Sequence, residues 1–176
     1  MAITDKKTGP WGLDQVYNKI NQGSIWDYSG LLELFSWGNG TTGRNGQNNT
    51  TNYSSPVQLP GTTWANGEYK YGIGGNSVSV AIRTDGTLWA WGNNQVGQLG
   101  HNNITQYSSP KQVGSGTDWR SVGCWDNNNS ATKTDGTLWA FGQNRRGAAG
   151  QDNTTQYSSP TQVGTDTDWG IPISCA

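Results

Sequence analysis

The chain has 176 residues and a net charge of −1 from 11 basic and 12 acidic side chains, a size typical of one domain. This even balance without a basic stripe argues against binding to nucleic acid or to anionic membranes, and no apolar run is long enough to span a bilayer. Only 31% of the residues are hydrophobic, but 10 Trp and 7 Tyr supply enough apolar area for a folded core.

Residues 1–30 differ in pattern from the rest and are expected to form an N-terminal docking segment. Apolar residues at positions 13, 16, 17 and 20 share one helical face, which predicts a short amphipathic helix that ends near Gly23. A helix this short must pack its apolar face on another surface. It either covers the open end of the following domain or docks the chain on a larger assembly through six anchors: Trp11, Leu13, Val16, Tyr17, Ile20 and Trp26.

This segment also resembles the short leaders that precede variable domains in structural proteins of tailed bacteriophages. The likeness is carried by Trp-Gly-Leu at 11–13, Val-Tyr at 16–17 and Gly-x-Ile-Trp at 23–26. The resemblance implies that the segment fixes the rest of the chain to a virion.

Residues 31–176 contain an internal repeat, with units at about 37–90, 91–140 and 141–176. Trp37, Trp91 and Phe141 are each followed by Gly and are spaced by 54 and then 50 residues. The sequence Tyr-Ser-Ser-Pro recurs at 53–56, 107–110 and 157–160. The aromatic residues at equivalent positions are expected to form the core of the repeats: Trp37, Trp64, Trp89, Trp91, Trp119, Trp139, Phe141 and Trp169.

Each unit carries the signals of short β-strands. Residues 77–83 alternate with period two, Thr-Asp-Gly at 84–86 interrupts the pattern, and 87–91 continues it. We expect a hairpin in which Gly86 takes the left-handed conformation and Asp85 bonds to the backbone of the turn. The sequence Thr-Asp-Gly-Thr-Leu-Trp-Ala of residues 84–90 recurs at 134–140 and is followed there by Phe141. Several short strands in a period near 50 residues predict an all-β, propeller-like fold.

The second unit resembles the regulator of chromosome condensation (RCC1-like) repeat. The likeness is carried by Trp-Gly-x-Asn at 91–94, Gly-Gln-Leu-Gly at 97–100, and Asp-Gly-Thr-Leu-Trp-Ala-Phe-Gly at 135–142. Because the repeats of this family build closed β-propellers, the resemblance implies a partial β-propeller of about 2.6 blades preceded by the N-terminal helix. A partial ring has open sheet edges, so we expect copies of the chain, a partner or residues beyond Ala176 to complete it.

The sequence offers no catalytic constellation, and no cofactor or metal site is expected. His101 is the single histidine, and Asp85 and Asp135 are explained by their turns. Three tyrosines, Tyr53, Tyr107 and Tyr157, recur in loops rich in Asn, Gln, Ser and Thr, where they either bind glycans or pack between blades.

The leading hypothesis is a non-enzymatic virion structural protein of a tailed bacteriophage, such as a capsid decoration, neck component or tail fibre. It would be made in the host cytoplasm, dock on other virion proteins or copies of itself, and display a surface for a host glycan. The alternative is an intracellular interaction module, like the members of the repeat family that act on a small GTPase or chromatin. A glycan-degrading enzyme would need a pair of carboxylates that face one cleft.

Overall fold

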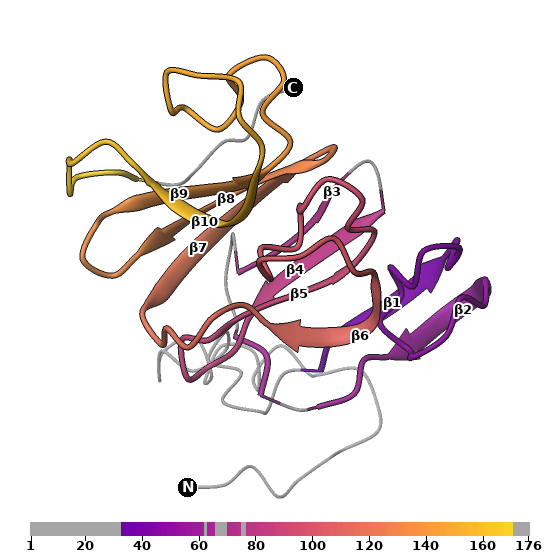
Figure 1. The fold of residues 1–176 in the computed structure, drawn as a ribbon. Coiled ribbons are helices and arrows are strands. Elements are labelled where there is room, and N and C mark those ends of the chain that lie inside the picture. The colour runs from indigo at the N-terminus through magenta and orange to yellow at the C-terminus, as the bar shows by residue number, and fades with distance from the viewer. Residues whose placement is uncertain (1–32, 62, 66–69, 75–76, 171–176) are drawn as a thin grey trace, which may run out of the picture. The chain divides into compact units, whose positions relative to one another are not determined.

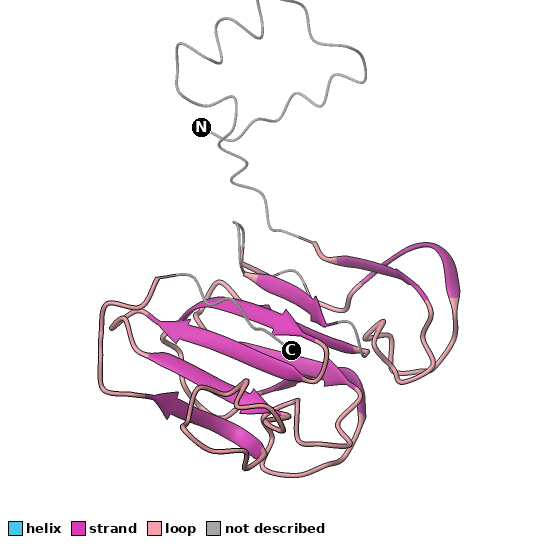
Figure 2. Ribbon diagram, turned by 90° about the horizontal axis from the view of Figure 1, so that it is seen from above, coloured by secondary structure: helices cyan, strands magenta, loops and turns pink. Residues whose placement is uncertain are grey.

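The computed structural model describes residues 33–61, 63–65, 70–74 and 77–170, and these ranges consist of strands and loops alone (Figures 1 and 2). No helix within them is long and apolar enough to cross a membrane. The chain divides into a unit of residues 1–31 and a unit of residues 32–176. The expected N-terminal helix and its anchors lie outside the described residues: Trp11, Leu13, Val16, Tyr17, Ile20 and Trp26.

The described strands form three antiparallel sheets (Figure 1). The first sheet pairs β1 (Phe35–Gly38) with β2 (Tyr53–Gln58). The second contains, in spatial order, β3 (Tyr71–Gly74), β4 (Val78–Ile82), β5 (Leu88–Gly92) and β6 (Tyr107–Gln112). The third contains β7 (Trp119–Trp125), β8 (Asn128–Lys133), β9 (Leu138–Gly142) and β10 (Tyr157–Val163) in the same arrangement. Each four-stranded sheet therefore takes its strands from two successive sequence units.

The strands that begin with Tyr-Ser-Ser-Pro are β2, β6 and β10, and β6 and β10 lie at an edge of their sheets. Pro110 and Pro160 fit there because an edge strand does not need every N–H for the ladder. The register of all three strands shifts where they pair with their neighbours. We refer to them as the Tyr-Ser-Ser-Pro strands.

The two Thr-Asp-Gly turns form as the sequence predicts. Asp85 Oδ1 accepts hydrogen bonds from the backbone N–H of Thr87 at 3.0 Å and from its hydroxyl at 2.6 Å. Asp135 accepts the same pair from Thr137. Gly86 has φ +77°, and a Cβ there would collide with the carbonyl oxygen of Thr117. The turn therefore requires glycine for both conformation and space.

Side chains of both four-stranded sheets share one hydrophobic core. All residues of β4 are buried, and Val78, Val80 and Ile82 belong to this core. Its buried members are Val78, Val80, Ile82, Leu88, Ala90, Leu99, Val113, Trp119, Val122, Ala131 and Phe141. A smaller cluster of Leu59, Trp64, Ala81 and Trp91 lies under the first sheet. The core thus fixes the second and third sheets against each other.

The aromatic positions of the repeat divide into buried and exposed members. Trp64, Trp91, Trp119 and Phe141 are buried, and Trp89 and Trp139 are partly buried. Trp37 and Trp169 are 61% and 37% exposed, so the expectation that they belong to the core is wrong.

The two exceptions have physical causes. The loop of the preceding sheet covers Trp91, whose Nε1–H donates to the carbonyl oxygen of Arg44 at 2.9 Å. Trp37 has no such loop beside it among the described residues. Trp119 begins β7 and packs edge to face on Trp139, whereas no described strand begins at Trp169.

Candidate functional site

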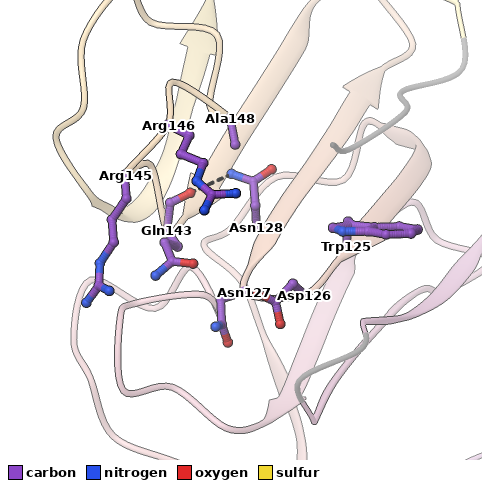
Figure 3. A pocket seen from close by; sticks show the side chains of 8 residues that line it. All are labelled: Trp125, Asp126, Asn127, Asn128, Gln143, Arg145, Arg146 and Ala148. Atoms are coloured by element: carbon purple, nitrogen blue, oxygen red, sulfur yellow. Dashed lines mark hydrogen bonds between the residues drawn. The ribbon is translucent and has the colours of Figure 1, made fainter. Parts of the chain in front are cut away.

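A pocket of about 230 Å³ opens where the turn between β7 and β8 meets the loop after β9 (Figure 3). We call it the Trp125 pocket. Its lining residues are Trp125, Asp126, Asn127, Asn128, Gln143, Arg145, Arg146 and Ala148.

Hydrogen bonds between the turn and the loop fix the walls of the Trp125 pocket. Asp126 has φ +48°, a left-handed conformation that Asp tolerates in tight turns. The N–H of Gln143 donates to the carbonyl oxygen of Asn127 at 2.8 Å, and Asn128 Nδ2 donates to that of Gln143 at 3.0 Å. Gln98, in the loop between β5 and β6 of the second sheet, donates through Nε2 to Asn127 Oδ1 at 3.0 Å. The pocket is therefore preformed.

The polar groups of the Trp125 pocket favour a ligand with negative charge. Arg145 and Arg146 are exposed, and Asp126 is the only acidic residue of the lining. Guanidinium groups form strong, charge-assisted hydrogen bonds with carboxylates and phosphates. Two arginines against one aspartate leave the lining with an excess of positive charge.

Asn128 adds an unused hydrogen-bond acceptor. The residue is 4% exposed, and its buried Oδ1 has no hydrogen-bond partner among the described residues. Buried polar atoms are rarely left without a partner. This oxygen is closed to solvent.

Trp125 supplies apolar surface at the rim. Its side chain is 55% exposed, and Figure 3 shows its indole across the pocket from Arg145. Tryptophan and arginine are the residue types that most often dominate the energy of protein interfaces. The combination is typical of a surface that binds another protein.

Comparison with known proteins identifies the repeat. The model of the "Regulator of chromosome condensation (RCC1) repeat" matches residues 85–127. The X-linked retinitis pigmentosa GTPase regulator homolog of Caenorhabditis elegans is 34% identical over 98 residues, which cover 50% of this chain and 7% of that protein. Residues 85–127 are therefore an RCC1 repeat.

Solved structures share the fold of the described sheets. Human WBSCR16 superposes with a TM-score of 0.60 at 23% identity, over 74% of this chain and 33% of that one. Prp20p of Saccharomyces cerevisiae gives a TM-score of 0.62 at 17% identity, over 76% and 34%. The structure of Kap60 bound to yeast RCC1 (Prp20) gives 0.60 at 18% identity, over 94% and 41%. The described sheets therefore have the fold of part of an RCC1-like β-propeller, and the chain spans about two fifths or less of these structures.

The tyrosines of the RCC1-like repeats have local partners. The hydroxyl of Tyr53 accepts from Asn49 Nδ2 at 2.8 Å, and Tyr157 bonds with Asn153 at 2.9 Å. The hydroxyl of Tyr107 accepts from Lys111 Nζ at 2.8 Å, and the same ammonium lies 4.0 Å from the centre of its ring. Tyr53 and Tyr157 thus tie the preceding loop to the strand that each begins, whereas Lys111 holds Tyr107 within its own strand. The glycan hypothesis stays a prediction.

None of the site residues expected from the sequence lines the Trp125 pocket. Trp125 could have been singled out because it is the one tryptophan of the repeats without a counterpart, since Gly75 stands at its position in the preceding repeat. Arg145 and Arg146 replace Gln95 and Val96 in the same way. Among the described residues, no group of three His, Cys, Asp or Glu could hold a metal ion.

Proposed function

We propose that this RCC1-like chain is a non-enzymatic protein-interaction module whose Trp125 pocket binds an acidic segment of a partner protein. The observation that carries the proposal is the exposed Trp125 beside two exposed arginines. Carboxylates of the segment pair with Arg145 and Arg146, and an apolar side chain covers the indole of Trp125. The related yeast structure was studied for binding to Gsp1p and histones, which makes protein binding a reasonable expectation for this fold.

The test is binding of a fluorescein-labelled peptide of alternating Glu and Leu residues, measured by fluorescence anisotropy. We expect binding that weakens at high salt and falls at least about tenfold in Trp125→Ala and in Arg146→Glu, as for a central interface residue. Arg120→Glu makes the same charge change at an exposed position of β7 outside the pocket and should bind normally. Equal binding by all four proteins, or preference for a Lys-Leu peptide, would refute the acidic partner.

We further propose that the partner belongs to the virion of a tailed bacteriophage, with residues 1–30 as the docking segment. The support is the likeness of residues 11–26 to phage leaders. Mass spectrometry of particles purified from the source should detect the chain, and removal of residues 1–30 should abolish its incorporation. Recovery of the chain only from the particle-free cell fraction would favour the intracellular module instead.

A further inference from the structure

The RCC1-like repeats contact each other through a recurring joint between a loop and a strand. In each of the three loops, at 39–52, 93–106 and 143–156, one residue other than glycine has the left-handed conformation: Asn48, Asn102 and Asp152, with φ of 57°, 55° and 52°. The N–H of Asn48 donates to Ser108 O at 2.8 Å, and that of Asn102 to Ser158 O at 2.6 Å. Both acceptors belong to Tyr-Ser-Ser-Pro strands of the next sheet.

A glycine in each loop makes room for this strand. A Cβ on Gly97 would lie 2.6 Å from Ser158 Cα, and one on Gly43 would collide with Ser108 Cα. Both glycines are buried by the contact. The joint is therefore a close backbone approach that only glycine permits.

A second part of the joint covers the aromatic residue that opens the next repeat. Gly46 lies against Trp91, and Gly100 lies against Phe141, each close enough that a Cβ would crowd the ring. Trp91 is 4% exposed and Phe141 is fully buried. The loop thus holds the strand and the aromatic ring of its neighbour together.

The third loop has the same shape but no neighbour among the described residues. Gly147 has φ +76° like its counterparts, yet its nearest neighbouring atom would be 4.0 Å from a Cβ. Gly147, Gly150 and Asp152 are exposed, and no described carbonyl accepts from the N–H of Asp152. The third loop thus has the loop side of the joint, but no described strand or aromatic ring of another sheet contacts it.

The first sheet has the strand and the aromatic ring of the joint, but no described loop covers them. Trp37 corresponds to Trp91 and Phe141 but is 61% exposed. Ser54 corresponds to Ser108 and Ser158 but is exposed. The sequence Tyr-Ser-Ser-Pro at 53–56 is identical to the two strands that loops of this chain already hold.

We propose that the third loop of one copy binds the first sheet of a second copy, so that the chain associates head to tail. The N–H of Asp152 donates to Ser54 O of the second copy, Gly147 contacts the same strand, and Gly150 covers Trp37. The carbonyl oxygen of Ala148 accepts from Trp37 Nε1, as that of Arg44 does from Trp91. A second copy is the occupant because it carries, in the same chain, the strand and ring that this loop geometry holds twice. Such a contact is heterologous and either closes a ring or propagates.

The test is sedimentation of the full chain over a wide range of concentrations, with circular dichroism as the check on folding. Wild-type protein should associate as its concentration rises. Gly147→Ala places a methyl group where the second copy's strand lies, and Ser54→Arg blocks that strand, so each should weaken association roughly tenfold to a hundredfold, the effect of overpacking a tight contact. Gly164→Ala, at an open glycine with φ +60°, and Ser115→Arg, in an exposed loop, are the matched controls and should associate normally.

Mixing the two blocked variants gives the sharpest outcome. Each retains one intact half, so an equimolar mixture should form a 1:1 dimer of twice the 19.0 kDa chain mass and nothing larger. A wild-type protein that stays monomeric, variants that associate normally, or a mixture that stays monomeric would overturn the proposal. The variants retain Trp125, Arg145 and Arg146, so loss of peptide binding and loss of association are measured separately.

Discussion

Replacing equivalent glycines by alanine should separate the cost of backbone conformation from the cost of contact between repeats. Gly97 and Gly147 have nearly the same φ, +78° and +76°, so alanine pays the same conformational cost at both, about 1 kcal/mol. Only at Gly97 does the new methyl group also meet the next sheet, 2.6 Å from Ser158 Cα and 2.7 Å from its Cβ. Overpacking of this kind costs about 1–3 kcal/mol because backbone must move.

We therefore expect Gly147→Ala to lower the free energy of unfolding by about 1 kcal/mol and Gly97→Ala by about 3 kcal/mol. In a domain of this size these losses correspond to about 3 °C and about 9 °C in Tm. Gly43→Ala, which meets Ser108 in the same way, should behave like Gly97→Ala.

The assay is urea unfolding followed by tryptophan fluorescence, at protein concentrations where sedimentation shows a monomer. Unchanged denaturant slopes would show that the comparison concerns stability rather than a change in the unfolded chain. If Gly97→Ala and Gly147→Ala differed by less than about 0.5 kcal/mol, the close approach of the loop to Ser158 would not be a determinant of stability.

Three further predictions concern polar groups of the core and its loops. Asn94 Nδ2 donates to the carbonyl oxygens of Asn103 and Thr105, and its Oδ1 accepts from Leu99 N–H, each at 2.9 Å. Asn94→Ala should therefore cost about 3 kcal/mol in urea unfolding, against less than about 0.5 kcal/mol for Gln95→Ala at an exposed position of the same loop. Burial lowers the pKa of His101 below its ordinary 6.5, so the imidazole binds a proton less readily in the folded chain than in the unfolded chain. The free energy of unfolding should therefore fall as the pH drops from 6.5, and His101→Gln should remove this part of its pH dependence. Burial raises the pKa of Cys124 to about 12, so peptide mass spectrometry should find this thiol alkylated by iodoacetamide at pH 8 only after unfolding.

The features that could be predicted from the sequence are those set within a few neighbouring residues. The turn at Asp85 and Gly86 needs only a short side-chain acceptor and a left-handed glycine in the right order, and both are visible in the sequence. The period of the aromatic residues likewise reveals the repeat without any long-range information.

What could not be predicted depends on which neighbour a repeat has. Trp37 and Trp91 stand at equivalent positions, but one is 61% exposed and the other 4%, because burial comes from the loop of the preceding sheet. The Trp125 pocket could not be predicted for a different reason. Its residues Trp125, Arg145 and Arg146 differ from their counterparts in the preceding repeat, so a search for repeated residues does not find them.

The first loop shows how far the repeat can change without losing its shape. Gly40 stands where the other loops have Asn94 and Asn144, and Asn45 stands where they have Leu99 and Ala149. Asn45 is 2% exposed and donates through Nδ2 to the carbonyl oxygens of Gly38 at 3.2 Å and residue 51 at 3.3 Å. A buried amide is therefore required inside the loop, but it can be supplied from either position.

The third loop has its amide in the usual place. Asn144 Oδ1 accepts from the N–H of Ala149 at 2.8 Å, and its Nδ2 donates to the carbonyl oxygen of Asn153 at 2.9 Å. These bonds help to hold Gly147 and Asp152 in the conformations of the occupied loops, although no residue of another described sheet covers them. A surface that is already ordered loses little conformational entropy when it binds. If Asn144→Ala loosened this loop, head-to-tail association should weaken even though no contacting atom is removed, whereas association unaffected by that change would mean that the loop is shaped by its partner.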